Sequence, residues 1–198
     1  LHPSGQLLPL LAPSKKGRVR LDKKVRHYLE QKNPPQFAPP GELPPFGEII
    51  RVLLEFDLLP AIFFLKSRID CDRALALCQE RSPRRNERLA DRLDELLEEH
   101  PHIARHHQLG DLRRKGVGAH HGGQLPLWKL VLETLMTEGL LDAIFATSTV
   151  SAGVNFPARS MVFFHSDRFN GQTFVPLTST EFHQMTGRAG RRGKDRIG

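Results

Sequence analysis

The sequence is poor in cysteine, which excludes a disulfide framework. Only two of its 198 residues are cysteines, Cys71 and Cys78. On a helix, seven residues of separation place their Cα atoms roughly 10 Å apart, beyond the reach of a disulfide. Their spacing also matches neither a C-x-x-C redox motif nor a zinc site. We therefore expect two reduced thiols with a structural role.

Long apolar runs are also missing. No stretch approaches the roughly 20 apolar residues of a membrane helix. The Leu7–Leu11 cluster is too short for a signal peptide and lacks its basic flank. Hydrophobic residues make up 39% of the chain and the mean hydropathy is −0.38, values typical of a globular protein. These features predict a cytoplasmic location and no membrane partner.

Two motifs of nucleotide-hydrolysing enzymes are absent. A phosphate-binding loop, Gly-x-x-x-x-Gly-Lys-Ser/Thr, does not occur, and the nearest approach at Gly193-Lys194 has Arg188 and Asp195 at two required positions. No Asp-Glu-x-His occurs either, because Asp94-Glu95 is followed by two leucines. This sequence therefore supplies no phosphate cradle and no magnesium carboxylates of the familiar kind.

Basic residues are in excess, with 29 Lys and Arg against 22 Asp and Glu, a net charge of +7 and a pI near 9.8. A basic surplus favours a polyanionic partner. The length fits one domain with an appendage.

The pattern of apolar segments indicates an α/β domain. The apolar run Ala61–Leu65 is typical of a strand buried on both faces of a parallel sheet. Before this strand, Ile49, Val52, Leu53 and Phe56 recur at helical spacing and predict a helix that Pro60 ends. After it we expect a helix carrying Cys71 and Cys78, one amphipathic helix within 82–115, and a strand ending at His120 and His121. The last expected elements are a helix from Pro126 with Leu127, Leu130, Val131 and Leu135 inside, strands at 141–146 and 159–164, a turn at 168–171, and a helix starting at the capping box Thr178–Glu181.

The first part of the chain has a different composition. Nine of the 15 prolines lie in residues 1–47. The short apolar runs Leu7–Leu11 and Val19–Leu21 predict a hairpin followed by a Pro-rich connector, although a disordered arm is the alternative. We expect residues 1–47 to form a linker with an edge hairpin and residues 48–198 to form the main domain.

A Gly/Arg-rich stretch near the C-terminus, Gln184-Met-Thr-Gly-Arg-Ala-Gly-Arg-Arg-Gly-Lys-Asp195, carries the strongest functional pattern. At about 100° per residue, a helix through it would place Gln184, Arg188 and Arg191 on one polar edge. The apolar residues on the opposite side are Phe182, Met185 and Ala189. One guanidinium group can bind two phosphate oxygens at once. A disordered basic tail is the alternative for this stretch taken alone.

The same stretch resembles the last motif of superfamily 2 helicases, in the DExH branch that includes superkiller-type and exosome-cofactor helicases. Three other segments also resemble motifs of this family: Ser67-Arg68 between a strand and a helix, His-His-x-Gly-x-x-Pro at 120–126, and the Thr/Gly/Asn loop from Thr147 to Pro157. Ser148 departs from the acidic residue common there.

The resemblance implies a RecA-like three-layer sandwich with a mostly parallel central sheet, the second of two motor domains, ending soon after its last motif. It further implies that ATP and Mg²⁺ are held by an N-terminal RecA-like domain of the same protein. The chain would then be inactive alone and part of an ATP-dependent helicase that acts on single-stranded RNA or DNA.

Residue roles follow from the same resemblance. Arg188 and Arg191 correspond to arginine fingers beside Gln184, and Gly153 and Asn155 to nucleotide contacts. The residues implied to contact nucleic acid are Ser67, Arg68, His120, His121, Gly123, Thr147 and Thr149. The two threonines also lie where parallel sheets bind ligands, at the carboxyl end of a strand.

Several alternatives remain at this level. The imidazoles of His120 and His121 could pack structurally, and Asp70 could simply cap a helix. A second group of histidines, at 100, 102, 106 and 107 beside Arg105, lacks the carboxylate or thiolate that would complete a metal site. The whole chain could be a non-catalytic nucleic-acid-binding module or a structural adaptor.

Overall fold

The computed structural model describes residues 2–4, 6–12, 20–36, 38–39, 41–147, 158–165, 167–169, 172–187 and 189–190. The chain divides into two compact units, Leu1–Pro45 and Phe46–Gly198. Each unit is described by itself.

The first unit contains a short hairpin and one helix. Strand β1 (Leu11–Ala12) pairs antiparallel with β2 (Arg20–Leu21), so the expected hairpin is present but has only two residues in each strand. Helix α1 (Lys23–Glu30) starts at Asp22, whose carboxylate accepts a hydrogen bond of 2.8 Å from the Lys24 N–H.

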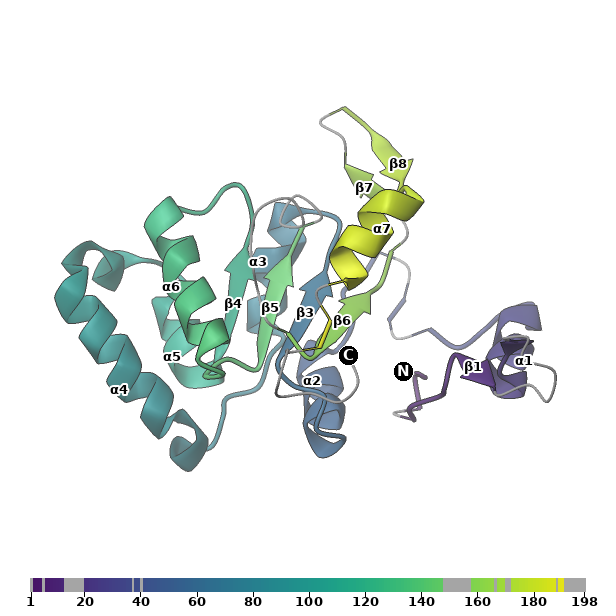
Figure 1. Ribbon diagram of the computed structural model, residues 1–198, viewed down its shortest axis with the longest axis horizontal. Coiled ribbons are helices and arrows are strands. Elements are labelled where there is room, and N and C mark those ends of the chain that lie inside the picture. The colour runs from purple at the N-terminus through teal and green to yellow at the C-terminus, as the bar shows by residue number, and fades with distance from the viewer. Residues whose placement is uncertain are drawn as a thin grey trace. The chain divides into compact units, whose positions relative to one another are not determined.

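The second unit alternates strands and helices around one sheet (Figure 1). Its elements are α2 (Phe46–Glu55), β3 (Ala61–Phe64), α3 (Arg68–Ala76), α4 (Pro83–Glu99), the 3₁₀ helix η1 (Pro101–Arg105), α5 (Leu109–Lys115), β4 (Val117–His120), α6 (Pro126–Thr137), β5 (Ala143–Ala146), β6 (Ser160–Phe163), β7 (Asp167–Phe169), β8 (Phe174–Pro176) and α7 (Ser179–Thr186).

The central sheet is parallel throughout its described strands, in the order β4-β5-β3-β6. Phe64 pairs with Ala146 on one side and Phe163 on the other, and His120 also pairs with Ala146. This register aligns the carboxyl ends of all four strands at one edge, the upper edge in Figure 1. The expected α/β architecture of RecA-like type is confirmed.

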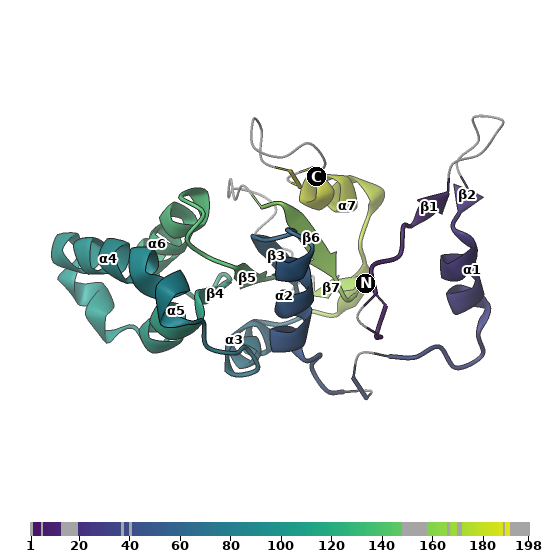
Figure 2. The same ribbon diagram turned by 90° about the horizontal axis from the view of Figure 1, so that it is seen from below.

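Helices cover both faces of the sheet, which gives three layers (Figure 2). Because side chains alternate along a strand, Ile62 and Phe64 face the core formed with α4, α6 and Met185 of α7. Phe63 faces the opposite side, where its ring lies 5.7 Å from that of Phe46 in α2. The ring centroid of Phe46 also lies 4.8 Å from that of Phe145 in β5. Burial on both faces explains why these strands are apolar at every position.

Residues 82–115 form three helical segments, and the amphipathic helix expected in this range is the first of them. Helix α4 carries the buried stripe Leu89, Leu93 and Leu96 and ends at Glu99. Pro101 then opens η1, because proline lacks the N–H that a continuing helix would need. Helix α5 follows and ends at Gly116, whose φ of 63° favours glycine.

Helix α6 also differs in detail from the sequence expectation. Leu130 is 53% exposed and does not belong to the inner face, whereas Trp128, Leu132 and Met136 are fully buried. The apolar residues are dense enough to allow either of two overlapping stripes. Packing against α4 and β4 selects the stripe that includes Trp128.

The C-terminal helix is shorter than its periodicity suggested. Helix α7 ends at Thr186, and Ala189 forms a parallel β-bridge with Ala158, so Ala189 does not lie on a helix. Met185 is buried as expected, but Phe182 is 45% exposed. The helix expected through Gln184 therefore does not extend to Ala189, and the two arginines that follow Gln184 lie outside the described residues.

A second hairpin lies between β6 and α7. Strands β7 and β8 pair antiparallel, so Arg168 belongs to a strand and not to the turn expected at 168–171. Lys66 holds this hairpin through an ion pair of 2.9 Å with Asp167, and Arg168 pairs with Glu181 in the capping box of α7. The hairpin is thereby tied to the loop that follows β3.

A buried ion pair joins three turns at the opposite edge of the sheet. Arg81 donates to the Asp142 carboxylate at 2.8 Å and to the Leu140 carbonyl at 2.8 Å, and its side chain is 6% exposed. The guanidinium lies against Gly116, where an added Cβ would come within 2.0 Å of Arg81 Cζ. Arg81 thus connects the start of α4 with the turns before β4 and β5.

We predict that Asp142→Ala lowers the free energy of unfolding by about 3–5 kcal/mol, because it leaves the buried Arg81 guanidinium without its counter-charge. Urea denaturation followed by circular dichroism measures this change. The matched control is Glu55→Ala, which removes an exposed partner of Arg51 and should cost only about 0.5 kcal/mol. Equal losses of stability in the two variants would contradict the role of the Arg81–Asp142 pair.

Candidate functional site

Three loops that the sequence singled out meet at the carboxyl edge of the sheet. They follow β3, β4 and β5, whose last residues are neighbours in the parallel register. The edge therefore brings together Ser67 and Arg68, the segment from His120 to Gly123, and Thr147. Open α/β sheets bind ligands at this edge. The strand register is the physical reason why these segments, which are far apart in the sequence, lie close together.

Ser67 and Arg68 occupy different environments. Ser67 is the N-cap of α3, and its hydroxyl accepts a hydrogen bond of 3.0 Å from the Asp70 N–H. The suggestion that Asp70 caps this helix is therefore wrong. Arg68 is exposed and reaches the loop after β4, where a Cβ built at Gly122 would lie 3.2 Å from its Nη2 and one at Gly123 would lie 3.5 Å from its Cδ. The two glycines leave room for this cation.

The imidazoles of His120 and His121 face the protein interior. His120 is 2% exposed, and its Nε2 lies 3.2 Å from a Glu133 oxygen. Burial lowers the pKa of His120, although Glu133 opposes this effect. His121 is 4% exposed and its Nε2 lies 3.2 Å from Asp72 Oδ1. Both side chains are therefore packed against protein groups.

Asp72 is the centre of a polar network that the sequence did not indicate. Its Oδ1 accepts from Gln108 Nε2 at 2.6 Å, from Gln124 Nε2 at 3.3 Å and from His121 Nε2. His121 Nδ1 accepts from the Gly123 N–H at 3.1 Å, which places the imidazole proton on Nε2, directed at Asp72. The network thus fixes the backbone turn at Gly123.

Gln108 extends this network into the core. Its Oε1 accepts from Trp128 Nε1 at 3.2 Å and from the Ala119 N–H at 3.4 Å, and the residue is 2% exposed. One glutamine thereby links α5, β4 and α6. No periodicity or motif marks Asp72, Gln108 or Gln124 in the sequence, because the side chains that bind Asp72 are 36 to 52 residues away from it along the chain.

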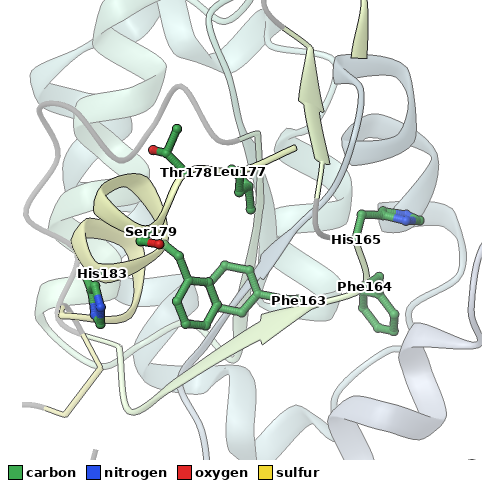
Figure 3. Close-up of a pocket in the computed structure, with 8 residues that line it drawn as sticks. Phe163, Phe164, His165, Leu177, Thr178, Ser179 and His183 are labelled. Carbon is green, nitrogen blue, oxygen red and sulfur yellow. The ribbon is translucent and has the colours of Figure 1, made fainter. Parts of the chain in front are cut away.

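An open pocket lies beside the same edge, between the end of β6 and the start of α7 (Figure 3). Its volume is about 700 Å³, and its walls include Phe163, His165, Thr178 and His183. Burial and the nearby Lys66 lower the pKa of His165. Gln184 is exposed on the same helix. The other residues proposed for nucleotide contact, Gly153, Asn155, Arg188 and Arg191, together with Thr149, lie outside the described residues.

The two cysteines have no sign of chemical reactivity. Both are free and buried. Burial raises the pKa of Cys78 to about 12 and raises that of Cys71 further, so both thiols stay protonated. Within the described part of the chain, no group of three or more His, Cys, Asp or Glu side chains is arranged to hold a metal ion. None of the helices described there combines the length and apolar composition needed to cross a membrane.

These features define an α/β domain of RecA-like type with a polar site at the carboxyl edge of its sheet. The sequence is 39% identical to the Probable helicase HelY of Mycobacterium tuberculosis over an alignment of 169 residues that covers 80% of this chain. It is 36% identical over 155 residues to the Exosome RNA helicase MTR4 of Homo sapiens and 33% identical over 166 residues to the DExH-box ATP-dependent RNA helicase DExH9 of Arabidopsis thaliana, covering 75% and 80% of this chain.

The chain belongs to the superfamily 2 DExH-box helicases, and the similarity is consistent with a C-terminal segment of such a helicase. The alignments span only 18%, 15% and 17% of the lengths of these three relatives. No family model matches the sequence.

We predict that Asp72→Ala destabilises the fold by about 1–3 kcal/mol, because it leaves three side-chain donors without their common acceptor. Thermal and urea unfolding measure the change in stability. Asp70→Ala is the matched control, since it removes a carboxylate from the same turn of α3 that accepts none of the network's hydrogen bonds. Comparable stability of the two variants would contradict the role assigned to Asp72.

Proposed function

We propose that this chain is the C-terminal motor domain of an ATP-dependent nucleic-acid helicase. The observation that supports this most directly is the convergence of the loops after β3, β4 and β5 at the carboxyl edge of a parallel sheet. Those loops carry the segments that resemble helicase motifs. The similarity to helicases over 75–80% of the chain supports the same function.

The ATP site, in this proposal, is shared with another domain. An N-terminal RecA-like domain of the same protein holds ATP and Mg²⁺ through a phosphate loop and acidic residues that this sequence lacks. This chain contributes Arg188 and Arg191 as arginine fingers when the two domains close, with Gln184 beside them. Gly153 and Asn155 approach the nucleotide. Relatives named ATP-dependent RNA helicases, from Schizosaccharomyces pombe and Arabidopsis thaliana, support the use of ATP.

The nucleic-acid track in this proposal crosses the loops at the carboxyl edge. Arg68 is its main cation, because the guanidinium is exposed and has no acidic partner within the described part of the chain. The backbone of Gly122 and Gly123 lies beneath it, and the Asp72 network keeps this turn in place. Thr147 and Thr149, which follow β5 in the sequence, are proposed to continue the track. Since the imidazoles of His120 and His121 are buried, their part in this track is to position the turn.

The partner is single-stranded nucleic acid bound through its backbone. The names of the human, fission-yeast and Arabidopsis relatives specify RNA, and HelY is named only as a helicase. Neither the charge surplus nor the described loops distinguish RNA from DNA, so both polymers belong in the assays. The cytoplasmic location remains a prediction from the sequence.

We predict that Arg188→Ala or Arg191→Ala in the full-length protein lowers nucleic-acid-stimulated ATP turnover by about 10³–10⁵-fold, equivalent to roughly 4–7 kcal/mol of transition-state stabilisation. Steady-state ATPase assays measure this decrease. The isolated 198-residue chain should hydrolyse no ATP. Arg84→Ala, which removes an exposed guanidinium on α4, is the control and should retain activity. Normal turnover in both finger variants would refute their role.

We also predict that the isolated chain binds single strands weakly, with an affinity that falls steeply as salt rises, because binding to phosphates releases counterions. Arg68→Ala should reduce the slope of log K against log salt by about 0.7 for each phosphate that this guanidinium neutralises. Fluorescence anisotropy with labelled RNA and DNA strands at several salt concentrations measures both slopes. Arg84→Ala should leave the slope nearly unchanged. A salt-independent affinity would argue against the proposed track.

A further inference from the structure

A second pocket lies next to the Gly122–Gly123 turn and is not used in the proposed function so far. It is about 370 Å³ in volume and is formed between η1 and the loop after β4. The lining residues that matter for its chemistry are His102, Arg105, His106, His107, Gly123 and Leu125. They include most of the histidine cluster that the sequence singled out and for which no metal set was found.

A stack of three rings forms one wall of this pocket. Trp128 is fully buried, and the His106 ring lies on it at 3.8 Å with an angle of 14°. The His107 ring lies on His106 at 4.6 Å with an angle of 28°. The stack therefore begins in the core and ends at an exposed imidazole. Its inner end is fixed because Trp128 Nε1 donates to Gln108.

His106 acts in this stack as a neutral ring. Burial lowers its pKa, and the neighbouring His107 shifts it in the same direction. Its Nε2 lies 3.0 Å from Gln124 Oε1 and its Nδ1 accepts from the Gln108 N–H at 3.3 Å, which places the single proton on Nε2. His107 is consequently held flat against a rigid, uncharged support. Flat exposed rings of this kind are stacking platforms for nucleobases.

Charge at the pocket favours an anion. Arg105 is exposed and has no hydrogen-bonding or acidic partner within the described residues. The residues that line the pocket include no Asp or Glu. The carboxylate of Asp72 is already engaged with His121, Gln108 and Gln124. A guanidinium beside an exposed ring is the combination that single-strand-binding surfaces use for phosphate and base.

The pocket is continuous with the nucleic-acid track. Gly123 lines the pocket. A Cβ built at the same glycine would lie 3.5 Å from Arg68 Cδ. Arg68, the Gly122–Gly123 turn and Arg105 therefore follow one another along the surface beside the end of β4. A strand that crosses Arg68 would meet this pocket next.

We propose that the pocket between η1 and the β4–α6 loop is a nucleotide subsite for single-stranded nucleic acid, in which a base stacks on His107 and Arg105 binds the adjoining phosphate. This inference rests on the proposed function and extends its track by at least one nucleotide. The matched anionic alternative is a free polyphosphate, which would use Arg105 but would not need the ring.

The test is anisotropy with labelled single strands and the 198-residue chain at about 50 and 200 mM salt. His107→Ala should weaken binding at least about fivefold, and His107→Phe should restore it to within about twofold, because phenylalanine keeps the stacking surface. Arg105→Ala should reduce the salt slope by about 0.7. Arg84→Ala serves as the charge-matched control, and thermal unfolding checks that each variant is folded.

The outcomes separate this inference from the proposed function. If Arg68→Ala weakens binding while the Arg105 and His107 variants bind normally, the track stands and the subsite is rejected. Equal decreases in affinity for Arg105→Ala and Arg84→Ala would likewise reject it, since the effect would then be net charge alone. Failure of the wild-type chain to bind any strand would reject the proposed track itself.

A competition experiment shows whether the pocket binds the phosphate of a nucleic-acid strand or a free polyphosphate. Inorganic tripolyphosphate is added to the complex of the chain with the labelled strand. If Arg105→Ala raises the tripolyphosphate concentration needed to displace the strand and His107→Ala leaves that concentration unchanged, the pocket binds free polyphosphate and the subsite is rejected. Displacement no stronger than that caused by an equal ionic strength of sodium chloride supports it.

Discussion

The parallel register of the central sheet is the constraint on which the other features depend. Because β3, β4, β5 and β6 end together, loops that are distant in sequence leave the sheet at one edge. Burial on both faces holds this register, since a shift by one residue would turn Ile62 and Phe63 to the wrong layers. The site is thus a consequence of how the strands pack.

Two polar centres hold the connections at opposite edges of this sheet. Arg81 and Asp142 join the turns at the amino ends of β4 and β5, and Asp72 joins α3 to the segments around β4 at the carboxyl end. Each centre satisfies several buried groups through one side chain. A rigid turn at Gly123 follows, and such a turn lets an exposed cation such as Arg68 lie in a defined position.

Much of the fold could be predicted from local signals. The apolar run at Ala61–Leu65, Pro126 at a helix start and the capping box at Thr178 each report on neighbouring residues, and all three elements are present. Periodicity failed where the chain had a choice that only packing resolves. Leu130 and Trp128 both fit an apolar stripe of α6, and the helix through Gln184 ends at Thr186, before Ala189 pairs with Ala158.

The sequence by itself determined the class of domain, the strands of its central sheet and which loops carry polar motifs, because these depend on residue type and short-range spacing. Only the tertiary structure decided that His120 and His121 point inward, that Asp72 gathers three donors, and that Trp128, His106 and His107 form one stack. These contacts join residues far apart along the chain. Their geometry exists only after the sheet has brought the segments together.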